Sequence, residues 1–409
     1  MKKGNLIIDL QYGSTGKGLI AGILAKRDKP DTLVTAWAPN AGHTFIHTNG
    51  TKQVHRMLAN GIVSPRLRRI LIGPGSLIDP QVLAHEMEEA SIPARMVAIH
   101  PAAAIVTAEH VAAEAGPMTK IGSTKKGVGE AMIQRIRRDP DRQNTAMLYS
   151  SSCHVPHNEL VEVGLGGCVV SADTYQKYLD IADVVQIEGA QGFSLSMYHG
   201  FYPYTTSRDV STTQVLADCA IPIDWIKRLN VVGTLRTFPI RVANRFNDQG
   251  EMVGWSGPCF WDQRELDWER DLGRKAELTT VTKLPRRIFS FSTLQAKQAI
   301  RMCGVDELFL NFVNYLPSKE QAFDFVLETE RDLKTKINYV GMGAAEQDVL
   351  DISDIALEDS YYGIFPRGLF SGDKPFVPER EEKLKTFLGS YPHYTFGGAD
   401  LLKRTAEIS

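Results

Sequence analysis

The stretch Asn5–Ile20 (NLIIDLQYGSTGKGLI) constrains the fold more than any other part of the chain. A short apolar run leads into a turn that contains three glycines and one lysine, and apolar residues then recur at helical spacing. Glycines let backbone N–H groups approach an anion, and a following helix would place its positive N-terminus there. The stretch therefore predicts a strand, a P-loop-like phosphate-binding loop and a helix. Gln11 stands where a full Walker motif has its first glycine, so a turn that needs only flexibility is the alternative.

Further short apolar runs alternate with segments of helical periodicity. They are Thr32–Trp37, Arg69–Ile72, Met96–Ile99, Val184–Ile187, Val231–Leu235 and Leu308–Phe312. This alternation is typical of an α/β protein whose large, mostly parallel sheet is covered by helices on both faces. No repeat or linker interrupts the pattern, so we expect residues 1–409 to form a single domain with helical and loop insertions. The polar stretches Pro317–Thr335 and Val377–Lys385 are expected to be exposed helices with their connections.

The composition excludes several classes of function. With a net charge of −2, the chain has no global field that would attract nucleic acid, so we expect no direct nucleic-acid binding. The five cysteines show no CxxC spacing, which argues against a zinc cluster and favours a reducing compartment. No stretch of about 18 apolar residues and no export signal is present, so we expect a cytoplasmic protein without membrane contact.

Polar turns that contain glycine follow several predicted strands, at the sheet edge where open parallel sheets bind ligands. They are Pro39–Thr44 (PNAGHT), Ile121–Gly129 (IGSTKKGVG), Gln186–Gly192 (QIEGAQG) and His199–Ser207 (HGFYPYTTS). In the first turn, Asn40 offers an amide, Gly42 a backbone carbonyl and His43 a proton donor near neutral pH. Ordinary structural roles remain open for each of these side chains. In the basic run that follows the second turn, Arg135 and Arg137 are expected to lie on a solvated helix face.

Taken together, these turns resemble those of adenylosuccinate synthetase. The motifs GSTGKG (13–18), NAGHT (40–44), IGSTKKGVG (121–129), EGAQG (188–192), YPYTTS (202–207) and ELTTVTKLPRR (277–287) occur in the order and rough spacing of that family. The resemblance implies an adenylosuccinate synthetase-like fold, a homodimer, and a magnesium-dependent ligase that joins L-aspartate to the 6-position of a purine nucleotide. In that reaction a nucleoside triphosphate phosphorylates the 6-oxygen, and the aspartate amine then displaces the phosphate.

The resemblance also implies a role for individual residues. The triphosphate would be held by Gly13, Ser14, Thr15, Gly16, Lys17, Gly18, Gly42, His43, Thr44, Asn311 and Asn314. The purine monophosphate would be held by Ser14, Asn40, Ser123, Thr124, Arg138, Gln191, Thr206 and Val242, with Arg138 reaching in from the neighbouring subunit. Aspartate would be held by Thr280, Val281, Thr282 and Arg286. The implied catalytic residues are His43, Ser14 and Lys17, with His43 as general acid, and the implied magnesium ligands are Ser14 and the carbonyl of Gly42.

Three departures from the family pattern change the expected substrates. Ser14 replaces an aspartate that contacts magnesium and takes a proton from the base ring. Leu284 replaces an arginine near the ribose hydroxyls, so a 2'-hydroxyl would have no partner there. An unpaired buried hydroxyl costs about 1–3 kcal/mol, and this cost favours a deoxyribose. In the family, a carboxylate in the segment that corresponds to Asn311–Asn314 accepts hydrogen bonds from the guanine of GTP, and this segment has none. ATP or dATP is therefore expected as the phosphoryl donor in place of GTP.

These departures together resemble a phage branch of the family that makes 2-aminoadenine nucleotides for modified DNA. The branch joins L-aspartate to dGMP and gives N6-succino-2-amino-2'-deoxyadenylate, which would place this chain in a host cytoplasm. Two alternatives remain open from the sequence. One is an ordinary adenylosuccinate synthetase that uses IMP and GTP, and the other is a catalytically silent nucleotide-binding homologue.

Overall fold

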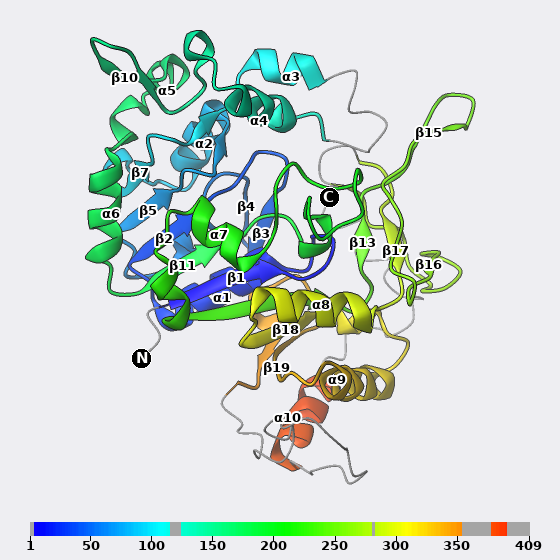
Figure 1. Ribbon diagram of the computed structural model, residues 1–409. Coiled ribbons are helices and arrows are strands. Elements are labelled where there is room, and N and C mark those ends of the chain that lie inside the picture. Colours follow the sequence, from blue (N-terminus) through cyan, green and yellow to red (C-terminus); the bar gives the residue numbers. More distant parts are fainter. Residues whose placement is uncertain (1–3, 115–123, 280–282, 354–377, 391–409) are drawn as a thin grey trace.

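The computed structural model describes residues 4–114, 124–279, 283–353 and 378–390 (Figure 1). The strands are β1 (Gly4–Asp9), β2 (Thr32–Thr35), β3 (His43–Ile46), β4 (Lys52–His55), β5 (Arg69–Ile72), β6 (Leu77–Ile78), β7 (Val97–Ile99), β8 (Ala104–Ile105), β9 (Met147–Tyr149), β10 (His154–Pro156), β11 (Val185–Glu188), β12 (Leu229–Arg236), β13 (Ile240–Arg241), β14 (Arg245–Phe246), β15 (Met252–Gly254), β16 (Glu265–Leu266), β17 (Arg287–Phe289), β18 (Glu307–Asn311), β19 (Ile337–Gly341) and β20 (Val349–Asp351). The α-helices are α1 (Lys17–Asp28), α2 (Pro80–Glu89), α3 (Ala108–Glu114), α4 (Val128–Arg137), α5 (Asn158–Glu162), α6 (Ala172–Asp180), α7 (Thr212–Asp218), α8 (Thr293–Cys303), α9 (Lys319–Leu333) and α10 (Pro378–Gly389).

The central sheet has nine strands in the order β20-β19-β18-β12-β1-β11-β2-β5-β7. Every neighbouring pair is parallel except β19 and β20, which are antiparallel. The predicted mostly parallel α/β sheet is therefore confirmed, and each of the apolar runs predicted as a strand overlaps one of its members. Strand β1 lies in the middle of the sheet, so the glycine-rich loop that follows it emerges at the centre of the carboxyl edge.

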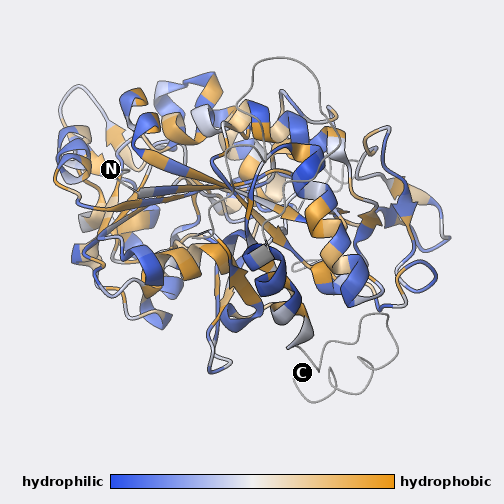
Figure 2. Ribbon diagram, turned by 90° about the horizontal axis from the view of Figure 1, so that it is seen from below, coloured by the Kyte–Doolittle hydropathy of each residue, from blue (hydrophilic) through white to orange (hydrophobic). Residues whose placement is uncertain are grey.

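Both faces of the sheet are buried, as the alternation of side chains along β1 shows. Leu6 and Ile8 pack with side chains of α6, α7, α8, α9 and α10 on one face. Ile7 packs with Leu19 and Ile20 of α1 on the other face, where α2 covers a neighbouring part of the sheet. Figure 2 shows the hydrophobic colouring concentrated on the inner strands and on the inward sides of the helices. A parallel sheet covered on both faces needs such apolar strands.

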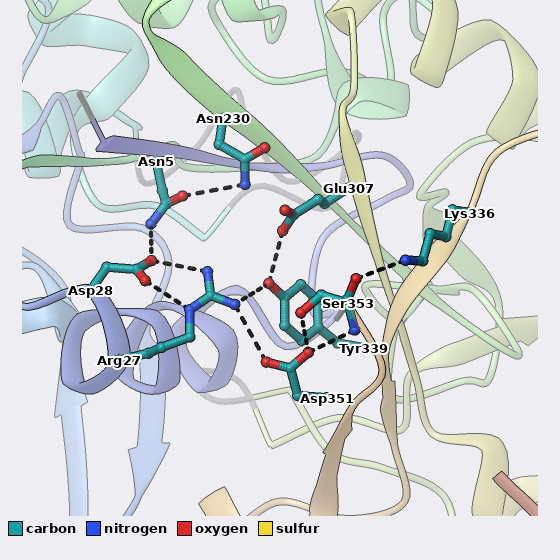
Figure 3. A network of polar contacts seen from close by, with 9 residues as sticks. All are labelled: Asn5, Arg27, Asp28, Asn230, Glu307, Lys336, Tyr339, Asp351 and Ser353. Atoms are coloured by element: carbon teal, nitrogen blue, oxygen red, sulfur yellow. Dashed lines mark hydrogen bonds and ion pairs between the residues drawn. The ribbon is translucent and has the colours of Figure 1, made fainter. Parts of the chain in front are cut away.

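A polar network lies near the starts of β1, β12 and β18 and includes residues of α1, β19 and β20 (Figure 3). Arg27, near the end of α1, donates to the Tyr339 hydroxyl at 2.6 Å and to Asp351 at 3.3 Å. Tyr339 in turn donates to Glu307 at 2.8 Å, at the start of β18. The network fixes the C-terminal end of α1 to the strands β18, β19 and β20. Because α1 is thereby anchored at its far end, its N-terminus is held over the carboxyl edge.

The two polar stretches expected to be exposed helices form α9 and α10, but the expectation of exposure is wrong for one side of each. Leu384 and Leu388 of α10 join the main core. Arg380 of α10 and Glu330 of α9 form a buried ion pair with an Nη2–Oε1 distance of 2.6 Å. The two stretches are polar on average, so their composition did not reveal that one side of each helix is buried. Among the described residues, no helix has the length and apolar character needed to cross a bilayer.

Candidate active site

A cleft of about 370 Å³ opens at the carboxyl edge of the central sheet. It is lined by the loop after β1, the turn before β3, and the chain that follows β11, β13, β18 and β19. Fifteen of the residues assigned to ligands line it: Gly13, Ser14, Thr15, Gly16, Lys17, Gly18, Asn40, Gly42, His43, Thr44, Thr124, Gln191, Val242, Arg286 and Asn311. Turns that are far apart in the sequence thus converge on one cavity.

Some of the assigned residues do not line the cleft. Arg138 is exposed at the end of α4, Thr206 donates its backbone N–H to Leu195, and Asn314 is buried in a 3₁₀ turn after β18. Ser123, Thr280, Val281 and Thr282 lie outside the described residues. Their assignments therefore stay predictions.

Asp9, at the end of β1, holds the phosphate loop in place through its carboxylate. Its side chain is fully buried and accepts hydrogen bonds from the backbone N–H groups of Gln11 and Gly13 at 2.9 and 3.2 Å. It also accepts from the Thr15 hydroxyl and from the Lys17 ammonium, the latter at 3.1 Å. The Thr15 side chain therefore supports the loop, and only its backbone remains to face a ligand.

The N-terminus of α1 is built to receive an anion. Gly16 precedes the helix with φ 98°, a conformation that favours glycine, and no side chain caps the first turn. At Gly18 a Cβ atom would approach the backbone nitrogen of Thr44 to 2.8 Å, so glycine permits α1 and β3 to lie side by side. Uncapped N–H groups at a helix N-terminus bind phosphate well. This geometry supports a phosphate site between the loop after β1 and the turn before β3.

Lys17 links the phosphate loop to the turn after β11. Its ammonium donates to the Gln191 carbonyl at 2.7 Å, in addition to its ion pair with Asp9. The Gln191 side chain donates to Asn40 at 3.0 Å. The Gln191 side chain thus contacts another residue assigned to the purine nucleotide. Its amide and that of Asn40, both assigned to the purine nucleotide, lie together on one wall of the cleft.

His43 stacks on a buried aromatic ring. The imidazole lies parallel to the indole of Trp37, with ring centroids 4.0 Å apart and an interplanar angle of 13°. Trp37 is itself held by a hydrogen bond from its indole N–H to the Glu188 carbonyl at 2.7 Å. Burial is the main cause that holds the pKa of His43 well below its ordinary value, and the positive charge of Lys17 and the nearby His55 ring lower it further. The ring is therefore neutral at pH 7 in this state and can act as a hydrogen-bond donor of fixed orientation.

The buried histidines predict that the free energy of unfolding falls when the pH drops below about 6.5. Burial lowers the pKa of His55 to about 4. Between that pH and about 6.5 the unfolded chain binds more protons than the folded chain, so stability present above 6.5 is lost as the pH falls. Thermal unfolding at about pH 7.5 and about pH 5 checks this, with His55→Gln as the comparison. The same loss of stability in the variant and in the unchanged protein would contradict a role for His55.

The chain around the predicted aspartate segment forms another part of the cleft lining. Arg286 and Leu284 line the cleft, and Arg286 donates from Nε to the Leu278 carbonyl at 3.3 Å. Its backbone N–H donates to the Glu277 carbonyl at 2.8 Å, so the two ends of the segment lie next to each other. Leu284, which was expected to contact the sugar, is about one-third exposed and faces the cavity.

Sequence reasoning missed several residues of this site. Asp9, Trp37, Arg236 and Glu277 hold cleft residues in place, and none was singled out. Asp9 had a detectable signal, because a carboxylate directly after a buried apolar run points to the carboxyl end of a strand. Arg135 was placed on a solvated face, which is wrong. Its guanidinium donates to the carbonyls of Pro74 and Ala102 at 2.9 and 2.6 Å.

The model of the adenylosuccinate synthetase family matches residues 6–154 and 167–322, which is most of this chain. The chain belongs to the adenylosuccinate synthetase family. This family consists of carbon–nitrogen ligases, so the protein is an enzyme of that class.

The relatives of this adenylosuccinate synthetase homologue include phage enzymes. It is 52% identical over 326 residues to the N6-succino-2-amino-2'-deoxyadenylate synthase of Salmonella phage PMBT28, covering 78% of this chain and 88% of the relative. It is 49% identical over 359 residues to the enzyme of the same name from Acinetobacter phage SH-Ab 15497, covering 84% and 92%. The structure of cyanophage S-2L succinoaminodeoxyadenylate synthetase bound to dGMP and dATP has a TM-score of 0.76 and 45% identity, covering 86% and 95%.

Proposed function

We propose that this enzyme joins L-aspartate to the 6-position of dGMP, using ATP or dATP, to give N6-succino-2-amino-2'-deoxyadenylate for 2-aminoadenine DNA. The observation that carries this proposal is Ser14 at the cleft, in the position where the family pattern has aspartate. The phage relatives that carry the synthase name, and the cyanophage structure with dGMP and dATP, support the same substrates. The enzyme would work in the host cytoplasm.

In the proposed reaction the triphosphate lies on the N-terminus of α1 beside Lys17, and the purine lies along the wall formed by Asn40 and Gln191. The 6-oxygen attacks the γ-phosphorus, the nucleoside diphosphate leaves with the electron pair of the broken phosphorus–oxygen bond, and the ring N1 proton passes to solvent. The His43 N–H donates to the oxygens between purine and phosphorus, where negative charge develops. Arg286 then binds a carboxylate of aspartate through its guanidinium fork. The aspartate amine attacks carbon 6, and phosphate leaves with the electron pair of the carbon–oxygen bond.

The residues at the cleft fit magnesium that arrives with the triphosphate. Among the described residues, no group of three or more His, Cys, Asp or Glu side chains could hold a metal ion alone. Mg²⁺ typically takes few protein ligands beside phosphate oxygens and water. The Gly42 carbonyl and the Ser14 hydroxyl would supply those few ligands, since both residues line the cleft and neither is buried. Bound there, magnesium neutralises charge on the phosphates.

Leu284→Arg is expected to raise the activity with GMP relative to dGMP by about tenfold. The new guanidinium would donate to a 2'-hydroxyl that the leucine leaves without a partner. The ratio of kcat/KM for GMP and dGMP measures the effect, and Leu284→Met is the control for lost packing. An unchanged ratio in Leu284→Arg would show that position 284 does not discriminate between ribose and deoxyribose.

The enzyme is proposed to be a homodimer in which Arg138 of one subunit reaches the monophosphate bound by the other. Arg138 is exposed and does not line the cleft of its own chain. Exposed apolar side chains occur on α4, which ends next to Arg138, and on β9, β10 and α5. They are Ile133, Ile136, Tyr149, Val155 and Val161. Exposed apolar side chains that gather in one patch are typical of a surface that binds another protein.

Arg138→Ala is expected to raise the KM for dGMP by about tenfold or more, because a phosphate contact is lost. Mixing this variant with a His43→Ala subunit checks that the arginine acts across the interface. Mixed dimers then contain one site with both residues intact, so activity should return on mixing. Activity of the mixture that equals the sum of the separate variants would contradict action in trans.

The proposed function is tested by identifying the product. Purified enzyme is incubated with dGMP, L-aspartate and magnesium ATP, and the nucleotides are separated and weighed by mass spectrometry. We expect a species with the mass of succinylated 2-amino-deoxyadenylate, formed in equal amount with released phosphate. Omission of aspartate should remove the product, and the absence of this species in the complete mixture would overturn the proposal.

A further inference from the structure

Arg236, the last residue of β12, contacts three of the segments that form the cleft. Its side chain is fully buried, and its Nη1 donates to the Ser14 carbonyl of the phosphate loop at 3.1 Å. Its Nη2 donates to the Glu277 carboxylate at 2.6 Å. The guanidinium also lies over the ring of Phe312, which follows β18, at 4.1 Å from the centroid. One rigid cation therefore joins the phosphate loop, the start of the aspartate segment and the chain beside Asn311.

The backbone of Arg236 is fixed as firmly as its side chain. The Gln11 side chain accepts from the Arg236 N–H at 2.9 Å and donates to the Arg236 carbonyl at 3.2 Å. Gln11 belongs to the same turn as Ser14. The position of the guanidinium relative to the phosphate loop is thus set by three hydrogen bonds.

Glu277 connects Arg236 to Arg286, and both Glu277 and Arg286 line the cleft. Its carboxylate also accepts from the Tyr315 hydroxyl at 2.8 Å, and its backbone carbonyl accepts from the Arg286 N–H at 2.8 Å. The Arg286 carbonyl in turn accepts from the Trp268 indole at 2.7 Å. Arg286 is therefore held through Glu277 on one side and through Trp268 on the other.

We propose that Arg236 and Glu277 are positioning residues that hold Arg286, on the aspartate side of the cleft, in a fixed place relative to Ser14, on the purine side. The proposal rests on the proposed function, in which Arg286 binds the aspartate carboxylate. The amine must meet carbon 6 of a purine held by other loops, and small misplacements of reacting groups lower rates strongly.

Stability alone does not account for this pair. Arg236 is fully buried, whereas the Glu277 side chain is 27% exposed. The cost of taking the cation out of water offsets much of its attraction to a carboxylate that solvent still screens, so such a pair adds little to stability. The planar guanidinium, in contrast, binds a carboxylate and a carbonyl in one fixed geometry that lysine cannot reproduce. A geometric role and a purely structural role therefore make different predictions for kinetic constants.

The test uses Glu277→Gln, Arg236→Lys and the double variant in the full-length enzyme. The kinetic constants for aspartate and dGMP are measured by phosphate release. The phosphorylation step is measured without aspartate, as exchange of isotopic oxygen between bridging and non-bridging positions of ATP. The matched control is Glu330→Gln, which alters the buried Arg380–Glu330 pair of the same 2.6 Å distance, outside the residues that line the cleft. Thermal unfolding is followed for every variant.

Glu277→Gln should raise the KM for aspartate about tenfold while the oxygen exchange stays within about twofold. Arg236→Lys should raise the same KM by a similar factor and also slow the exchange, because the Ser14 contact is lost. The double variant should equal Arg236→Lys in its KM for aspartate, since both changes break one interaction. Glu330→Gln should lower the unfolding temperature and leave that KM unchanged.

An unchanged KM for aspartate in Glu277→Gln would overturn the proposal, as would multiplied effects in the double variant. All assays are run with dGMP and again with IMP. A wild-type enzyme that accepts only IMP contradicts the proposed substrate, while the KM for aspartate of the variants with IMP still decides whether the pair positions Arg286.

Discussion

Alanine in place of His43 is expected to lower kcat by about 10²–10⁴-fold with only a modest loss of dGMP binding. The imidazole is held by its stacking on Trp37 at 4.0 Å, on the side of the cleft next to Lys17. A neutral ring fixed in this way donates a hydrogen bond where charge develops on the 6-oxygen and the transferred phosphoryl group. Alanine removes that donor without changing the phosphate loop.

The measurement combines steady-state phosphate release with calorimetric titration of dGMP. The matched control is His85→Ala, which removes an exposed histidine of α2 whose ring lies 3.5 Å from Glu89. The control should keep the wild-type kcat. If His43→Ala also kept it, His43 would have no part in the chemistry.

Ser14→Asp is expected to reverse the preference for the purine, lowering kcat/KM for dGMP by about 10²-fold and raising it for IMP. Ser14 has φ 57°, a conformation that aspartate tolerates better than most residues, so the backbone of the loop should be kept. A carboxylate at this place would bind the 2-amino group and ring N–H of guanine in the ground state and compete for magnesium. For IMP, which has no 2-amino group, the same carboxylate supplies a base.

Ser14→Ala is the control, because it removes the hydroxyl without adding charge. It should weaken the reaction of dGMP and leave IMP a poor substrate. If Ser14→Asp retained the wild-type ratio of kcat/KM for dGMP and IMP, the choice of purine would not depend on this position.

The parts of the fold that follow from local patterns were predictable from the sequence. The apolar run and glycine turn at Asn5–Ile20 give β1, the phosphate loop and α1, because strand burial, positive φ and helical spacing are local properties. The turn at Pro39–Thr44 and the turn at Gln186–Gly192 meet because both follow strands at one sheet edge, and their contact is the Gln191–Asn40 hydrogen bond.

Supporting residues could not be predicted in this way, because their roles depend on contacts between distant segments. Trp37 stacks on His43 only after the chain turns back into β3, and Arg236 meets Glu277 across 41 positions. Asn314 was assigned to the triphosphate by its place in the segment. Phe312, with φ 63°, redirects the chain into a 3₁₀ turn after Asn311, and Asn311 lines the cleft whereas Asn314, inside that turn, does not.

This member of the adenylosuccinate synthetase family is proposed to act on dGMP. The most direct test is a matrix of phosphate-release assays, in which dGMP, GMP and IMP are each combined with ATP, dATP and GTP in the presence of L-aspartate and magnesium. We predict the highest kcat/KM for dGMP with ATP or dATP, a lower value for GMP, and little turnover of IMP. A higher kcat/KM for IMP with GTP than for dGMP with either adenine nucleotide would contradict dGMP as the substrate.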